Sequence, residues 1–192
     1  MIAAQHRQAP HDGAGAADRI ASTNAAAELF FAASADAIAV ACRAMAERFE
    51  KGGRLFVCGT GAQRSDVAHV VVEFVHPVIV GKRALPTIAL PDVAAGAAEA
   101  ALATLSRRGD LLMLISTAPP STDAERVLAA ASERGILTIA LTGAVEGAFP
   151  QSDHLFMVGS ADACIVQETH EMLYHILWEL VHVFFDHGPV HA

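Results

Sequence analysis

Two short stretches, about a hundred residues apart, carry the side chains best suited to chemistry. The first contains His69 and Glu73, and the second contains Gln167, His170 and His175. Both stretches have an apolar pattern typical of helices, so His69 and Glu73, four residues apart, stand on one helical face. An imidazole and a carboxylate placed in this way can share a divalent metal ion, or they can act as an acid–base pair.

The composition limits the class of protein. A chain of 192 residues is long enough for one domain with a large core. The formal net charge of -8 argues against a nucleic-acid binder held by phosphate contacts. The longest apolar runs, such as residues 111–115, are too short to cross a bilayer, so we expect no membrane segment. Three widely spaced cysteines, Cys42, Cys58 and Cys164, indicate reduced thiols and a cytoplasmic protein.

Apolar strands alternate with helices along the chain. We expect strands at residues 54–58, 87–90, 111–116, 136–142 and 154–158. We expect helices at residues 20–50, 66–75, 97–107, 122–134 and 163–185, with a break in the first of them near residues 32–34. Residues 1–18 are expected to be a disordered tail and residues 19–188 a single domain. This alternation predicts an α/β fold, a three-layer α/β/α sandwich with a parallel, flavodoxin-like five-stranded sheet.

Polar or glycine-rich turns follow two of the expected strands, where α/β proteins bind ligands. Gly59-Thr60-Gly61 could present backbone N–H groups to an anion such as phosphate, but a tight turn without a ligand is about as consistent with the spacing. Ser116, Thr117 and Ser121 could also receive a phosphate. Capping of the next helix is the interpretation that the local sequence favours for the hydroxyl groups of this second loop.

The order of these residues resembles the phosphoheptose isomerases of the sugar isomerase (SIS) domain family, from about residue 25 to residue 185. The resemblance rests on four motifs: Gly59-Thr60-Gly61 with Asp66, His69 and Glu73; Ser116-Thr117 with Ser121; Leu141-Thr142-Gly143; and Gln167-Glu168-x-His170 with His175. The family implies the same α/β fold for this chain. It also implies a homotetramer with active sites between subunits, in which the last helix of one chain faces the site of another.

The resemblance further implies roles for individual residues. His69, Glu73, Gln167 and His175 would hold a divalent metal, typically Zn²⁺, with Glu73 as the catalytic base and His175 as the catalytic acid of an aldose–ketose isomerisation through an enediol. This chemistry suits a partly desolvated glutamate, because a raised pKa improves it as a base. The family substrate is a sugar phosphate, by default sedoheptulose 7-phosphate. The implied substrate-binding residues are Gly59, Thr60, Gly61, Ser116, Thr117, Ser121 and Gln167.

The chain departs from the family pattern in its substrate loops. Ala62 and Gln63 stand where the family has Gly and Ser, and residues 118–120 read Ala-Pro-Pro in place of Ser-Gly-Asn. The segment 91–107 is shorter than its counterpart in the family by roughly ten residues. Short connections are the usual length for loops that carry no function. Two alternatives therefore stay open. One is an enzyme of the same fold with a different small substrate, and the other is a non-enzymatic SIS scaffold that binds a protein partner.

Overall fold

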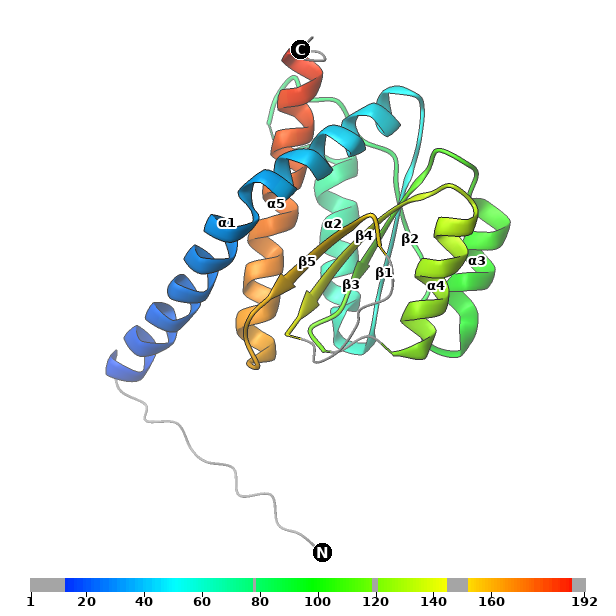
Figure 1. Ribbon diagram of the computed structural model, residues 1–192. Coiled ribbons are helices and arrows are strands. Elements are labelled where there is room, and N and C mark those ends of the chain that lie inside the picture. Colours follow the sequence, from blue (N-terminus) through cyan, green and yellow to red (C-terminus); the bar gives the residue numbers. More distant parts are fainter. Residues whose placement is uncertain (1–12, 78, 119–120, 145–151, 188–192) are drawn as a thin grey trace, which may run out of the picture.

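The computed structural model describes residues 13–77, 79–118, 121–144 and 152–187 (Figure 1). Along the chain these residues form a series of helices and strands. The elements are α1 (Gly13–Glu50), β1 (Leu55–Gly59), η1 (Gly61–Gln63), α2 (Arg64–Val75), β2 (Thr87–Ala89), η2 (Ala94–Gly96), α3 (Ala97–Leu105), β3 (Leu111–Ile115), α4 (Thr122–Glu133), β4 (Leu137–Gly143), β5 (His154–Val158) and α5 (Ala163–His187). Apart from the start of α1, no boundary differs from the expected one by more than two residues.

The five strands form one parallel sheet in the order β2-β1-β3-β4-β5. After β1 the chain moves outward to β2, then crosses back to pair β3 with the other edge of β1. The strand order therefore reverses between β1 and β3, where doubly wound sheets open a crevice at their carboxyl ends. The predicted parallel, flavodoxin-like sheet is confirmed.

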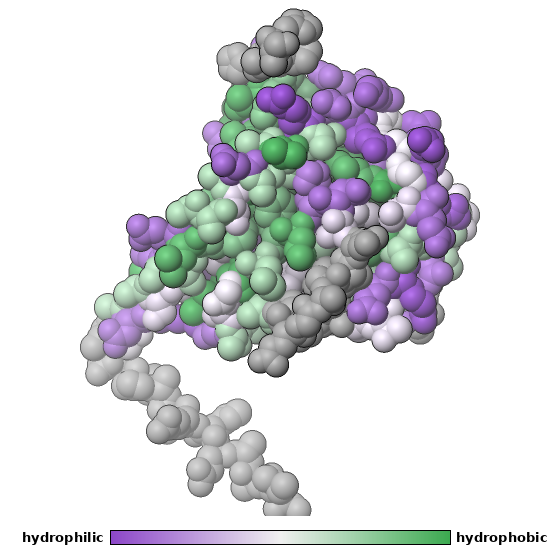
Figure 2. Space-filling view, viewed as in Figure 1, coloured by the Kyte–Doolittle hydropathy of each residue, from purple (hydrophilic) through white to green (hydrophobic). Residues whose placement is uncertain are grey.

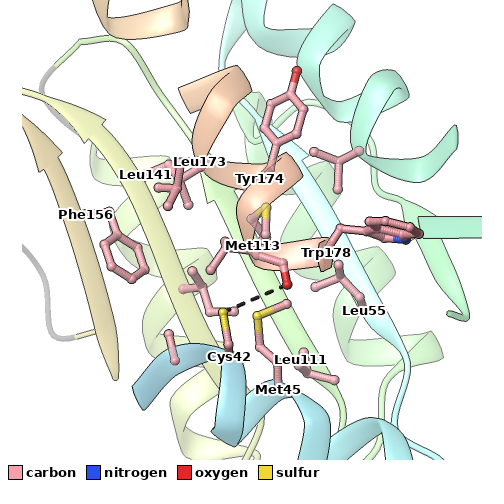
Figure 3. Packing of buried hydrophobic residues seen from close by; sticks show 14 of the residues in the cluster. Cys42, Met45, Leu55, Leu111, Met113, Leu141, Phe156, Leu173, Tyr174 and Trp178 are labelled. Carbon is pink, nitrogen blue, oxygen red and sulfur yellow. Dashed lines mark hydrogen bonds between the residues drawn. The ribbon is translucent and has the colours of Figure 1, made fainter. Parts of the chain in front are cut away.

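Successive residues of each strand point to opposite faces of the sheet, and both faces are covered by helices. Leu55, Val57 and Met113 belong to one apolar cluster with residues of α1, α2 and α5. Figure 3 shows this cluster around Met45, Met113 and Trp178. On the other face, strand residues such as Phe56 pack against α3 and α4. The residues of β1, β3 and β4 are buried throughout, and burial on both faces explains why most of them are apolar.

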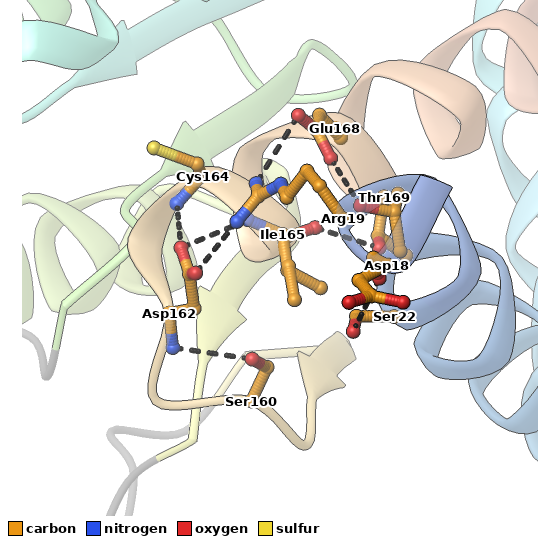
Figure 4. Close-up of polar contacts among 10 residues, drawn as sticks. Asp18, Arg19, Ser22, Ser160, Asp162, Cys164, Ile165, Glu168 and Thr169 are labelled. Atoms are coloured by element: carbon orange, nitrogen blue, oxygen red, sulfur yellow. Dashed lines mark hydrogen bonds and ion pairs between the residues drawn. The ribbon is translucent and has the colours of Figure 1, made fainter. Parts of the chain in front are cut away.

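Helix α1 differs from the expectation in two ways. It is continuous from Gly13 to Glu50, so the break expected near residues 32–34 is wrong. It also begins within the stretch expected as a tail, while residues 1–12 lie outside the described residues. The first turns are held by α5 and the turn before it: Arg19 pairs with Asp162 at 2.6 Å and with Glu168 at 3.2 Å, and the Thr23 hydroxyl donates to Glu168 at 2.7 Å (Figure 4). Alanine, a strong helix former, carries the helix through residues 32–33.

The same helix leaves much apolar surface uncovered. It extends beyond the body of the molecule (Figure 1), and Figure 2 shows green residues gathered along its length. Leu29 is 74% exposed and Val40 60% exposed. By length and composition alone, residues Gly15–Glu50 could also cross a membrane, a test that core helices of water-soluble proteins pass as well. A face of this kind on an α/β domain indicates contact with another apolar surface.

Candidate active site

Helices α2 and α5 lie side by side on one face of the sheet and run in the same direction (Figure 1). Their buried sides, which include Val70 and Phe74 of α2 and Leu177 of α5, pack into one core. Their polar side chains meet in sequence order along the two helices. The contacts pair Asp66 with Gln167, His69 with Glu171, Tyr174 and His175, and Glu73 with His175. Residues about a hundred positions apart are therefore brought together by helix packing.

His69, Glu73 and His175 form a compact triangle of potential ligand atoms. The Nε2 atoms of His69 and His175 are 3.2 Å apart, and Glu73 Oε1 lies 3.6 Å from the first and 3.8 Å from the second. Zinc bonds of 2.0–2.2 Å at tetrahedral angles place neighbouring donors about 3.3–3.6 Å apart. The three side chains are partly exposed, which leaves the group accessible to a substrate. The donor set and its spacing fit a divalent metal.

Gln167, the fourth predicted ligand, lies about two turns before His175 on α5. Its amide nitrogen donates to the two carboxylate oxygens of Asp66, at 3.0 and 3.3 Å. This bond directs the amide nitrogen to α2 and leaves the amide oxygen as the atom that a metal would use. Burial raises the pKa of Asp66, and the hydrogen bond from Gln167 opposes that rise. The metal-binding role of Gln167 stays a prediction.

The triangle forms within one chain. The resemblance implied that the last helix faces the site of a neighbouring subunit, whereas α5 lies here against α2 of its own chain, with His175 in contact with His69 and Glu73. The physical reason is that α2 and α5 cover the same face of the sheet and share its apolar core. Each chain thus carries its own triangle.

Two neighbours of the triangle were missed in the sequence. Tyr174 Oη lies 2.9 Å from Nδ1 of His69, and Glu171 Oε1 lies 3.3 Å from the same atom. Burial is the main cause that raises the pKa of Tyr174, and nearby carboxylates add to it. A signal was available, because residues 167, 171, 174 and 175 share one helical face at spacings of three and four.

The turns after β1 and β3 come together. Thr60 Oγ1 lies 3.3 Å from Ser116 Oγ and 3.2 Å from Gln63 Oε1. The amide nitrogen of Gln63 donates to Thr117 Oγ1 at 3.0 Å. Gln63 is buried, because the absence of a side chain on Gly59 lets it pack close to the strand. Three of the predicted substrate-binding hydroxyl groups therefore already bond to one another or to Gln63.

Two further predicted contacts are also occupied by the chain's own groups. The backbone N–H of Gly61 donates to the Asp92 carboxylate at 2.9 Å. The Ser121 hydroxyl accepts from the backbone N–H of Ala124 at 3.2 Å and caps α4, as the alternative interpretation of this loop predicted. Pro119 and Pro120, between Ser116 and Ser121, lie outside the described residues.

Two other histidines of α5 have structural contacts. His170, in the last motif, is fully buried, and its Nε2 faces the carbonyl oxygen of Thr142 at 3.2 Å. Burial lowers the pKa of His170 to about 4. His182 is also buried, with its two ring nitrogens facing the carbonyl oxygens of Trp178 and Arg83. Neither histidine contacts the triangle.

Comparison with known proteins identifies relatives of this chain. Residues 20–143 match the family model described as the SIS domain. Phosphoheptose isomerase from Nitratidesulfovibrio vulgaris is 34% identical, over 83% of each chain, and that from Chlorobium phaeovibrioides is 38% identical, over 72% of this chain and 73% of the relative. The solved phosphoheptose isomerase from Neisseria gonorrhoeae is 25% identical with a TM-score of 0.75, covering 86% of this chain and 96% of the other.

The chain belongs to the SIS domain family. Within that family it lies in the phosphoheptose isomerase branch, which is a branch of isomerase enzymes. A second structure from this branch, from Francisella tularensis, is 28% identical with a TM-score of 0.72 and covers 85% of this chain and 94% of the other. The family resemblance read from the motifs is thus confirmed.

Proposed function

We propose that this protein is a metal-dependent aldose–ketose isomerase of a sugar phosphate, and that it converts sedoheptulose 7-phosphate to D-glycero-D-manno-heptose 7-phosphate. The observation that carries the proposal is the triangle of His69, Glu73 and His175, whose donor atoms lie 3.2–3.8 Å apart. The names of the relatives support the substrate class. A non-enzymatic scaffold would have no need to keep these three side chains together.

The chemistry of the reaction assigns the roles. Aldose–ketose isomerisation removes a proton from the carbon beside a carbonyl group and returns a proton to the neighbouring carbon. Glu73 serves as the base. Its carboxylate is partly buried and so has few water contacts, which favours proton abstraction. His175, which lies beside Glu73, serves as the acid that protonates the substrate oxygen. A divalent metal held by His69, Glu73, Gln167 and His175 would stabilise negative charge on the enediolate oxygens.

The phosphate group of the substrate is proposed to bind where the turns after β1 and β3 meet. Gly59, Thr60 and Gly61 lie on one side of this place and Ser116 and Thr117 on the other. The carboxyl ends of parallel strands and the starts of the following helices favour anions. Ser121 at the start of α4 and Gln167 on α5 complete the proposed binding set.

Phosphorus NMR of sedoheptulose 7-phosphate with zinc-supplemented protein tests the proposal. We expect a new heptose 7-phosphate resonance with the natural chain and none with Glu73→Gln, which keeps the size of the side chain but removes the base. Circular dichroism should show that the variant is folded. Unchanged turnover in Glu73→Gln would overturn the role of the base, and retention of full activity after chelation of metals would overturn the metal dependence.

A second candidate is an isomerase of a smaller or unphosphorylated sugar. It is favoured by Gln63 and Asp92, which occupy the hydroxyl and N–H donors that a phosphate would use. Gln63→Ser should release Thr60 and Thr117, and inorganic phosphate titrated by calorimetry is the probe. Tighter phosphate binding by Gln63→Ser than by the natural chain, together with no conversion of the heptose phosphate by the natural chain, would favour this second candidate.

We also propose that the protein is a cytoplasmic homotetramer with residues 19–188 as its single domain. The uncovered apolar face of α1 supports an assembly of identical chains, because such a face is buried most simply against a copy of itself.

A further inference from the structure

We propose that Glu171 and Tyr174 are positioning residues, which hold His69 with hydrogen on Nδ1 and with the lone pair of Nε2 directed toward Glu73 and His175. The inference rests on the proposed metal site. It adds two residues, both on α5, to the group that orients a ligand on α2.

The contacts place each ring nitrogen of His69 in a different environment. Nδ1 lies 3.3 Å from Glu171 Oε1 and 2.9 Å from Tyr174 Oη. Nε2 faces the opposite way, toward Nε2 of His175 at 3.2 Å and Oε1 of Glu73 at 3.6 Å. The rings of His69 and Tyr174 meet edge to face with centroids 5.2 Å apart, so the tyrosine also limits rotation of the imidazole. Tyr174 is fully buried and therefore fixed.

The chemistry of the neighbours selects one tautomer. An ionised carboxylate can only accept hydrogen bonds, so Glu171 is satisfied by His69 only when Nδ1 carries hydrogen. A bare Nδ1 would set its lone pair against the carboxylate oxygen. The Tyr174 hydroxyl accepts or donates as required, and it can share the Nδ1 hydrogen as a second acceptor. Nε2 is then left without hydrogen, which is the form that binds a metal.

Hydrogen bonding of this type raises the basicity of a ligating histidine and fixes its ring. Removal of such a partner typically lowers metal affinity about 10–100-fold. Of the two partners of His69, Glu171 carries a negative charge, whereas Tyr174 is neutral but more rigidly held. We therefore expect each single substitution to weaken the site and the double substitution to weaken it further.

The first experiment needs no metal. In the metal-free protein, ¹⁵N NMR of the imidazole rings distinguishes the two tautomers, and His69→Gln assigns the His69 signals. We expect hydrogen on Nδ1 in the natural chain and a mixture of tautomers in the Glu171→Ala, Tyr174→Phe double variant. Hydrogen on Nε2 of His69 in the natural chain would overturn the inference, because Tyr174 would then be the donor.

The second experiment measures zinc affinity by competition with a chromophoric chelator. Glu171→Ala should bind zinc at least 10-fold more weakly, and Glu171→Gln, which keeps an acceptor oxygen, should recover part of the loss. Glu168→Ala is the matched control, since it removes the same charge one turn earlier but faces Arg19 and Thr23 on α1. Equal affinities for Glu171→Ala and Glu168→Ala would contradict the positioning role.

The two experiments separate this inference from the proposed function. If the natural chain binds no zinc, the metal-dependent function fails, while the tautomer of His69 still tests the positioning of its ring. If zinc binds tightly and Glu171→Ala has no effect, the proposed function stands and the positioning role fails. Melting temperatures of all variants show whether any loss of affinity arises from unfolding.

Discussion

Three histidines on α5 show how strongly position changes the chemistry of one residue type. His175 is partly exposed and contacts His69 and Glu73. His170 is enclosed, and its Nδ1 has no hydrogen-bond partner among the residues that the structure describes. The two ring nitrogens of His182 face backbone carbonyl oxygens. Only the first of these environments leaves a ring nitrogen accessible to a ligand from solvent.

His170 should make stability depend on pH. Its pKa falls from 6.5 to about 4 on folding, so the unfolded chain binds more protons between these values. The folded state is therefore favoured fully above pH 6.5, where the His170 imidazole is neutral in both states. As the pH falls toward 4, the free energy of unfolding decreases by about 3 kcal/mol in total. Urea unfolding measures the free energy of unfolding at pH 7.5 and at pH 5.0. The decrease in this free energy from pH 7.5 to pH 5.0 should be about 2 kcal/mol smaller in His170→Asn than in the natural chain. Parallel losses in both proteins would contradict this prediction.

At the scale of elements, the turn after β3 approaches the end of β4 so closely that no side chain fits at the last residue of β4. A Cβ atom on Gly143, at the end of β4, would lie 2.6 Å from the carbonyl oxygen of Thr117. The same Thr117 accepts a hydrogen bond from Gln63 at the end of η1. The packing of the strand ends therefore determines the geometry of the proposed phosphate site.

Gly143→Ala should therefore destabilise the fold by about 1–3 kcal/mol, because a backbone atom must move to make room. The displaced Thr117 should also weaken substrate binding, seen as a higher KM with a smaller change in kcat. Gly159→Ala, where a Cβ meets nothing within 4 Å, is the matched control and should change the free energy of unfolding by less than about 0.5 kcal/mol. Similar unfolding midpoints for the two variants would show that the turn containing Thr117 can move without loss of stability.

At the scale of the whole molecule, α1 is an element whose apolar surface a single chain buries only in part. Leu29 lines an apolar groove with Phe30 of the same helix and Met157 of β5. Only 28% of the most apolar stretch of this helix is buried within one chain. A single chain thus forms the whole sheet and the triangle, but it leaves the apolar face of α1 uncovered.

Leu29→Glu should shift the protein toward smaller assemblies without unfolding it, because the residue is already exposed in the single chain. Each buried leucine contributes about 1.5–3 kcal/mol to an interface, and a tetramer repeats the loss in every subunit. Light scattering after size exclusion measures the mass. Leu105→Glu, an exposed leucine at the end of α3 on the opposite layer, is the control. A natural chain that elutes as a monomer would contradict the proposed tetramer.

Much of the fold and part of the site could be predicted from the sequence. The alternation of apolar strands with helices determines a covered parallel sheet, because each pattern reflects local backbone geometry. The same local geometry places His69 and Glu73 on one face of α2. The early start of α1 was missed because Arg19 and Thr23 are held by residues that lie about 145 positions later.

The tertiary structure decided which side chains meet. The sequence by itself determined the types of residue on α2 and α5 and their spacing within each helix. Only the packing of both helices on one face of the sheet closes the triangle with His175 and brings Tyr174 and Glu171 to His69. It also turns Gln63 inward onto Thr117. The physical reason is that spacing within a helix follows from its 3.6-residue repeat, whereas contacts between distant helices depend on the whole core between them.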